Sequence, residues 1–197
     1  MIILFGLAGS GKGTQGKALS EIFGWRWLSV GEAIRQTGEF KEITDRGELV
    51  PDEKVIELMN RQIEKAESEG FNVILDGYPR DVAQAEYLIN NMADKIEGAI
   101  VLEVPKEELY ERLALRGRDD DLKRDSIDRR FEVFEQNIDL ILPLLEAKSI
   151  PIERVDGVGT VEEVTNRLVA VVGRIAPSAM VQKDDVNGGE IEKSYGE

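Results

Sequence analysis

The chain has 197 residues, of which 42% are hydrophobic and 32% charged, an ordinary composition for a globular domain with one sizeable core. Its 39 acidic residues outnumber its 25 basic ones, and the formal charge of −14 argues against a surface that binds nucleic-acid phosphates or anionic lipid. Cysteine and histidine are absent, which excludes disulfides, thiolate zinc sites, cysteine nucleophiles and histidine bases.

The chain also shows no sign of a membrane span or a targeting segment. No apolar run approaches the roughly 18 residues that suggest a membrane helix. The first motif begins at residue 6, which leaves no room before it for a cleavable peptide. We therefore expect a cytoplasmic protein.

The first half of the chain alternates short apolar runs with amphipathic stretches. Residues 1–5 predict a buried strand, and the apolar spacing up to Phe23 predicts a helix after a glycine-rich turn. Residues 26–30 predict a second extended segment, followed by polar, helix-compatible sequence. A helix starts again after Pro51 and ends at Gly70.

The second half continues this alternation. Residues 72–75, 98–104 and 150–155 predict strands, and the intervening periodicity predicts helices at 81–91, 109–116, 127–145 and 160–172. Buried strands separated by helices indicate a parallel sheet covered on both faces, which is a three-layer αβα fold. Residues 174–197 lose the pattern and predict a polar, flexible tail.

The glycine-rich segment 6–14 (GLAGSGKGT) joins the first predicted strand to the first predicted helix. Glycines let the backbone approach phosphate oxygens, the helix N-terminus faces the anion, and Lys12 can neutralise the β and γ phosphates. General phosphate loops carry Ser or Thr directly after the lysine as a magnesium ligand, whereas Gly13 stands here and Thr14 follows. The sequence predicts a nucleotide site that differs from a generic NTPase.

Magnesium then depends on nucleotide oxygens, water and a remote carboxylate. Asp76 ends an apolar run and is the candidate, acting on Mg²⁺ through water. No Asn-Lys-x-Asp guanine-reading element occurs in the chain, which argues against a GTPase.

Four segments resemble the adenylate kinase family. Residues 6–15 end in its Gly-Lys-Gly-Thr-Gln pattern, and residues 28–35, 47–51 and 75–80, with Gln84 beyond, follow in the family's order. The resemblance spans about residues 1–173. It implies a P-loop NTPase fold with a five-stranded parallel sheet, a small helical monophosphate-binding region at 30–59 and a lid at 117–127. We expect the last two regions to move, because enclosing the reactants excludes water.

The resemblance implies that ATP donates a phosphoryl group to AMP and that ADP is the product. It also implies that Mg²⁺ is the cofactor and that the protein is a monomer. The implied ATP-binding residues are Gly9, Ser10, Gly11, Lys12, Gly13, Thr14, Arg112, Arg116 and Gly159. The implied AMP-binding residues are Val30, Gly31, Arg35, Glu48, Leu49, Val50, Gly77, Tyr78, Pro79, Arg80, Gln84, Arg118 and Arg130. The implied catalytic residues are Lys12, Arg80, Arg116, Arg118 and Arg130. Two nucleotides meeting at their phosphates carry roughly six or seven negative charges, which suits several bidentate guanidinium groups.

Two residues bear on the acceptor base. Gln84 offers a donor and an acceptor, which suits the Watson–Crick edge of adenine. Val30 stands where the family usually has threonine, so one hydrogen bond of about 0.5–1.5 kcal/mol is absent. Pyrimidine monophosphate kinases also tend to lack that hydroxyl, but they tend to lack the glutamine as well, and Gln84 therefore favours AMP.

The predicted lid is short. In the resemblance Arg112 stacks on the ATP adenine, Arg116, Arg118 and Arg130 grip the transferring phosphoryl group, and Asp120 or Asp121 orients an arginine. The segment between Arg116 and residue 127 has room only for a minimal loop, and without cysteine we expect no structural zinc.

Two alternatives to an adenylate kinase remain at this stage. One is a UMP/CMP kinase. The other is a nucleotide-binding regulatory protein without transfer activity, whose tail contacts a partner. In all cases we expect nucleotide partners rather than nucleic acid or membrane.

Overall fold

The structure is a computed structural model that describes residues 1–38, 40–46, 48–117, 121, 123–176 and 179. Five parallel strands form one sheet in the order β2-β3-β1-β4-β5. They are β1 (Ile2–Phe5), β2 (Arg26–Ser29), β3 (Val73–Asp76), β4 (Gly98–Glu103) and β5 (Ile152–Asp156). The central strand β1 is also the first in the chain, and its end leads into the glycine-rich loop.

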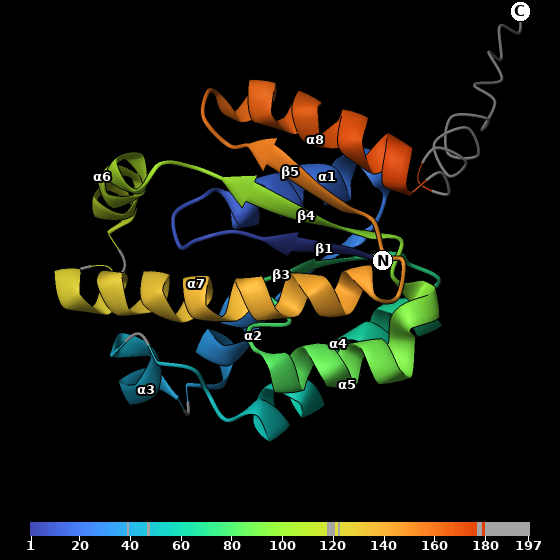
Figure 1. The fold of residues 1–197 in the computed structure, drawn as a ribbon, viewed down its shortest axis with the longest axis horizontal. Coiled ribbons are helices and arrows are strands. Elements are labelled where there is room, and N and C mark those ends of the chain that lie inside the picture. The colour runs from blue at the N-terminus through green and yellow to red at the C-terminus, as the bar shows by residue number, and fades with distance from the viewer. Residues whose placement is uncertain (39, 47, 118–120, 122, 177–178, 180–197) are drawn as a thin grey trace, which may run out of the picture.

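Helices cover both faces of the sheet (Figure 1). One face carries α1 (Lys12–Phe23) and α8 (Val161–Ile175). The other carries α2 (Val30–Thr37), α4 (Asp52–Ser68), α5 (Val82–Met92) and α7 (Arg124–Glu146). A 3₁₀ turn, Ala93–Lys95, follows α5, while α3 (Lys41–Asp45) and α6 (Lys106–Arg116) lie beyond the ends toward which the strand arrows point. The expected three-layer P-loop NTPase fold is confirmed.

The alternation of side chains along β1 explains the two layers. Ile2 and Leu4 belong to the apolar cluster under α1 and α8, whereas Ile3 and Phe5 belong to the cluster under α2, α4, α5 and α7. Successive side chains of a strand point to opposite faces, so a continuous apolar run is required where both faces are buried. A third, small cluster joins α6 to the start of α7.

Several element ends differ from the sequence-based prediction. The second strand stops at Ser29, because the Ser29 hydroxyl accepts a hydrogen bond from Glu32 N and so caps α2, which begins at Val30. The third strand includes Asp76, and α7 begins at Arg124 rather than at residue 127. A cap and a surface turn depend on few residues, so apolar periodicity alone places them poorly.

The predicted tail boundary at residue 174 is too early. Helix α8 runs to Ile175, and Ala176 and Ala179 are both fully buried against the cluster under α1 and α8. Small apolar side chains at these positions extend the buried face beyond the end of the helix. Most of the predicted flexible tail lies outside the described residues. No helix in the described part of the chain is both long and apolar enough to span a membrane.

Candidate active site

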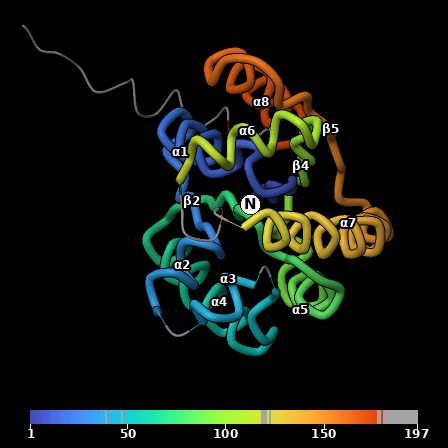
Figure 2. The backbone as a smooth tube through the Cα atoms, turned by 90° about the vertical axis from the view of Figure 1, so that its left-hand side faces the viewer, coloured from blue at the N-terminus to red at the C-terminus, as the bar shows by residue number. Residues whose placement is uncertain are grey.

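A cavity of about 1240 Å³ opens at the carboxyl ends of the parallel strands. This is the edge at which open α/β sheets bind ligands, because the loops after the strands meet there. Figure 2 shows α6 and α7 on one side of this end of the molecule and α2 and α3 on the other. Four parts of the chain line the cavity: the glycine-rich loop, the region 29–49, the segment 76–80 after β3, and α6 and α7 with the loop 157–161.

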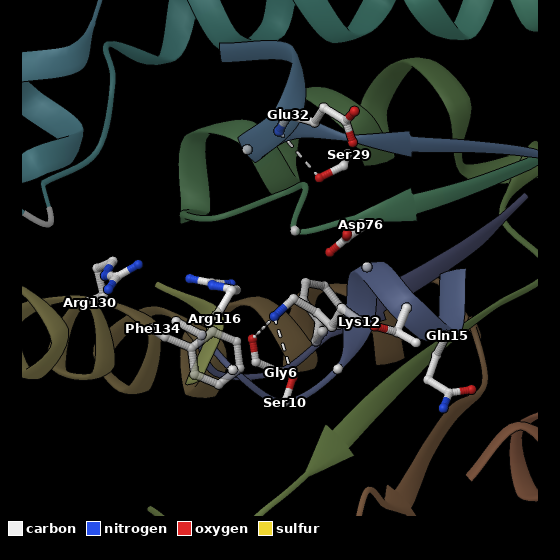
Figure 3. Close-up of a pocket in the computed structure, with 18 of the residues that line it drawn as sticks. Gly6, Ser10, Lys12, Gln15, Ser29, Glu32, Asp76, Arg116, Arg130 and Phe134 are labelled. Carbon is white, nitrogen blue, oxygen red and sulfur yellow. Dashed lines mark hydrogen bonds between the residues drawn. The ribbon is translucent and has the colours of Figure 1, made fainter. Parts of the chain in front are cut away.

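The glycine-rich loop wraps around the ammonium of Lys12. Lys12 Nζ donates to Gly6 O at 2.5 Å (Figure 3). It also donates to Leu7 O at 2.9 Å. Gly9 and Gly11 have φ values of +87° and +98°, in the left-handed region that favours glycine. A Cβ on Gly9 would also lie 3.0 Å from Leu113 Cγ, so the loop packs closely against α6.

The positive charge of Lys12 is weakly stabilised by the loop itself. Burial, and to a smaller extent the positive charges of Arg80, Arg116 and Arg130, outweigh the opposing charge of Asp76 and together lower the pKa of Lys12 to about 8. A group placed among like charges binds an anion strongly, because the anion relieves the repulsion. The loop is therefore prepared for phosphate.

Asp76 lies beside the start of α1 at the end of β3. Its side chain is buried, and its Oδ2 atom lies 3.8 Å from the point where a Cβ on Gly13 would stand. A single carboxylate suits Mg²⁺, which keeps several waters and takes phosphate oxygens as ligands. No cluster of three or more potential ligand side chains occurs among the described residues.

Two arginines meet over Gly31, at the start of α2. A Cβ on Gly31 would lie 3.2 Å from Arg35 Nη1 and 3.3 Å from Arg80 Nη2. Arg80 Nε donates to Gly77 O at 2.9 Å, which orients its guanidinium toward the cavity wall. The lack of a side chain at residue 31 thus permits two positive groups to approach one point, as an anionic phosphate requires.

Two further arginines share one buried carboxylate. Asp121 accepts hydrogen bonds from Arg116 Nε at 2.6 Å and Nη2 at 2.7 Å, and from Arg130 Nη2 at 2.8 Å. Burial alone would raise the pKa of Asp121, but the hydrogen bonds and charges of the two arginines outweigh it and lower that pKa. Figure 3 shows Arg116 and Arg130 on the same side of the site as Lys12. Of the two aspartates predicted to orient an arginine, Asp121 does so, and Asp120 lies outside the described residues.

Arg112 connects the glycine-rich loop to the loop before α8. It donates to Gly157 O at 3.0 Å and to Ser10 O at 3.5 Å, and it pairs with Glu108 one turn earlier. Gly159, with φ +123°, lines the same part of the cavity. Arg112 and Gly159 thus border the part of the cavity next to the glycine-rich loop.

The sequence of the chain matches the adenylate kinase family model over residues 4–150. The chain belongs to the adenylate kinase family. The protein named adenylate kinase from Thermus thermophilus is 35% identical over 187 residues, which cover 87% of this chain and 96% of that protein. Adenylate kinase from Synechococcus sp. is 37% identical over 180 residues, covering 86% and 96%. Adenylate kinase from Mycolicibacterium vanbaalenii is 37% identical over 184 residues, covering 88% and 99%.

Most residues expected to bind nucleotide in this family member line this cavity. On the donor side these are Gly9, Ser10, Gly11, Lys12, Gly13, Thr14, Arg112, Arg116 and Gly159. On the acceptor side these are Gly31, Arg35, Glu48, Leu49, Gly77, Pro79, Arg80 and Arg130. Arg118 lies outside the described residues.

Four residues expected on the acceptor side are buried behind the cavity wall instead. Val30, Tyr78 and Gln84 are fully buried and Val50 is 4% exposed, and none of them lines the cavity. Val30 Cγ1 lies 3.5 Å from the position of a Cβ on Gly77, so the valine packs against the wall rather than facing open space. The amide of Gln84 is bonded within the protein.

The structure also brings residues to the cavity that the sequence analysis did not assign there. Phe134 and Ile138 belong to the apolar stripe of α7, which was interpreted as core, yet both line the cavity as well. Trp27 lines it beside Gly13 and packs into the space left by Gly16, where a Cβ would lie 2.3 Å from the Trp27 ring. Periodicity identifies a buried face but does not say which part of that face borders a ligand site.

Proposed function

We propose that this member of the adenylate kinase family catalyses the reversible, magnesium-dependent transfer of a phosphoryl group, ATP + AMP ⇌ 2 ADP. The observation that carries the proposal is the convergence of Lys12, Arg80, Arg116 and Arg130 on one cavity that also borders Asp76. Such a group of cations matches two polyphosphates whose ends meet.

The donor nucleotide takes the side of the glycine-rich loop. Backbone N–H groups at the start of α1 and the Lys12 ammonium bind the β and γ phosphates of ATP. Arg112 and Gly159 border the adenine. Asp76 would hold a Mg²⁺ ion through bound water, and the ion would supply positive charge to neutralise the phosphates.

The acceptor nucleotide takes the side of α2. Arg35 and Arg80 bind the AMP phosphate across Gly31, and Leu49 with Glu48 borders its nucleoside. An oxygen of the AMP phosphate attacks the γ-phosphorus, and the bond to the β–γ bridging oxygen breaks, which leaves ADP on both sides. No proton is transferred, so a chain without histidine can carry out the reaction.

The lid arginines act on the group in transit. Arg116 and Arg130 lie on α6 and α7 and share Asp121, so a movement of this segment brings both toward the γ-phosphate. Arg118 is the further candidate in the lid at 117–127. Charge that is spread over the transferring group is stabilised most by donors already in place before the reaction.

A coupled assay of ADP formation with AMP, UMP, CMP and dTMP as acceptors tests the proposal. We expect the largest kcat/KM with AMP, and Arg80→Ala should lower kcat by roughly a hundredfold or more because it removes a group bound to the reacting phosphate. Arg154→Ala is the matched control, because Arg154 is an exposed arginine paired with Glu103 and neither residue lines the cavity. Faster turnover of UMP than of AMP would identify a UMP/CMP kinase instead, and ATP binding without ADP formation would favour a regulatory protein.

We further propose that the chain acts as a monomer in the cytoplasm. The residues assigned to both nucleotides come from one chain, so no second copy is required to complete the site. Its net charge of −14 gives no support for a nucleic-acid partner. The proposed lid needs no zinc, because the chain has no cysteine or histidine to hold a structural zinc ion.

A further inference from the structure

The side-chain amide of Gln84 makes three hydrogen bonds inside the protein. Its Nε2 donates to Asp52 Oδ1 at 2.9 Å and to Asp81 Oδ2 at 2.8 Å. Its Oε1 accepts from the backbone N–H of Arg80 at 3.0 Å. Both amide hydrogens and one oxygen lone pair are therefore used.

These hydrogen bonds fix the orientation of the Gln84 amide, with its NH₂ group toward the two carboxylates and its oxygen toward the Arg80 N–H. If the amide turned over, its oxygen would face two carboxylates and its NH₂ group would face the Arg80 N–H. All three hydrogen bonds would be lost, and like partial charges would face each other in a fully buried place. Gln84 is thus held in one of its two possible orientations.

The two carboxylates come from different helices. Asp81 caps α5, because its Oδ1 accepts from Gln84 N at 2.9 Å, so it stays with Gln84 on the same helix. Asp52 is the first residue of α4, and α4 and α5 lie side by side in Figures 1 and 2. If the monophosphate-binding region at 30–59 moves when AMP binds, the Asp52 carboxylate can move away from the Gln84 amide. Asp81 stays bonded to it, because both residues belong to the start of α5.

Two acidic side chains, Asp52 and Asp81, lie close together around the Gln84 amide. Burial, together with the neighbouring Asp52, raises the pKa of Asp81 to about 6, and Tyr78 and Arg80 also lie next to this pair. The Gln84 NH₂ group lies between the two carboxyl groups as their shared donor. This arrangement makes the orientation of the amide more costly to reverse.

We propose that Asp81 is a positioning residue that selects the acceptor base through the fixed orientation of Gln84. This inference rests on the proposed monophosphate kinase function and goes beyond it. In this structure the Gln84 amide is buried and does not line the cavity, so a base reaches it only after Asp52 has moved away. The amide oxygen then has one lone pair for an exocyclic amino group, and the N–H released by Asp52 can donate to a ring nitrogen. Adenine and cytosine carry that pair of groups, whereas hypoxanthine and uracil carry a carbonyl and a ring N–H in the same places.

A comparison of AMP with IMP tests the proposal, because the two differ at this edge of the base alone. We expect the wild-type protein to favour AMP strongly in kcat/KM. In Asp81→Asn the new side chain can donate as well as accept, so Gln84 can adopt both orientations, and the AMP to IMP ratio should fall by about tenfold. Asp94→Asn, at an exposed position in the 3₁₀ turn that follows α5, should leave the ratio unchanged.

Asp81→Ser is the second variant, since serine keeps the helix cap but does not reach as far as the carboxylate. It should also lower the AMP to IMP ratio. If either folded variant loses activity with AMP and IMP by the same factor, the amide only supports the backbone of Arg80 and the proposal is overturned. A wild-type protein that does not phosphorylate AMP would instead contradict the proposed function, and the ratio of CMP to UMP would then test the orientation of Gln84.

Discussion

Lys12 shows how a single side chain can be adjusted for its ligand. Its ammonium donates to the carbonyl oxygens of Gly6 and Leu7, and burial outweighs the attraction of Asp76 and lowers its pKa to about 8. The ammonium is about nine tenths protonated at pH 7 and about one tenth at pH 9, as follows from that pKa. A polyphosphate binds the protonated form, so binding must take up a proton above pH 8.

We therefore expect the Kd for ATP to rise as the pH increases through 8, by up to about tenfold per pH unit. The terminal phosphate of ATP is fully ionised in this range, since phosphate groups of this kind have a second pKa near 6. Titration calorimetry between pH 7 and 9.5 measures the effect. Lys12→Arg, which stays charged throughout, is the control, and equal slopes for both proteins would show that Lys12 does not bind the phosphates in its charged form.

At the scale of elements, α6 and α7 meet in a small apolar cluster of their own, made of Leu109, Leu113, Ile127 and Phe131. Asp121, between the two helices, joins Arg116 at the end of α6 to Arg130 on α7. The carboxylate side chain is 1% exposed, so the charges of two arginines are balanced by one almost completely desolvated anion. Removing that anion leaves the cations facing each other.

Asp121→Asn should consequently lower kcat by roughly ten- to a hundredfold, because both arginines lose the group that aims them. The arginines are partly exposed, so we expect a modest loss of stability of about 1–3 kcal/mol, less than for a fully buried ion pair. Steady-state kinetics and urea unfolding measure the two effects. Asp125→Asn, at an exposed position in the first turn of α7, is the control. A folded variant with kcat within threefold of wild type would contradict the role of Asp121.

For the whole molecule, the decisive feature is that one cavity of about 1240 Å³ reaches from Arg112 and Gly159 past Lys12 to Arg35. Its lining comes from loops after several strands, which the parallel sheet brings to one edge (Figure 3). The two proposed nucleotide sites are continuous, so one long ligand can fill both.

A single molecule of bisadenosine pentaphosphate should accordingly bind each chain, with both adenosines in place. At a thousandfold excess over its Kd the ligand should stabilise the fold by about 4 kcal/mol. For a chain of this size that corresponds to a rise in Tm of roughly 8–16 °C. Calorimetry gives the stoichiometry and scanning fluorimetry the Tm. Arg80→Ala should bind more weakly with the same stoichiometry, and a value of two inhibitors per chain would show that the sites do not meet.

Local sequence was sufficient to predict the layers, the glycine-rich loop and its lysine. The apolar run of β1, the turn and α1 are continuous in the chain, so their chemistry does not depend on distant residues. The positions of Asp76 and Arg80 were also recognisable, since each stands near the end of β3. Element ends such as Ser29 and the last turn of α8 were not, because a cap or a few buried alanines decide them.

What the tertiary structure decided involves residues far apart in the chain. Asp52 and Gln84 are 32 positions apart, and the sequence predicted a free amide for the base where the structure has one held by two carboxylates. The choice of Asp121, and the meeting of Arg35 with Arg80 over Gly31, likewise depend on how helices from different parts of the chain pack. Sequence determined which groups are available for phosphate chemistry. Packing determined which of those groups are already bonded to one another, because hydrogen bonds and charges act over a few ångströms in space and not along the chain.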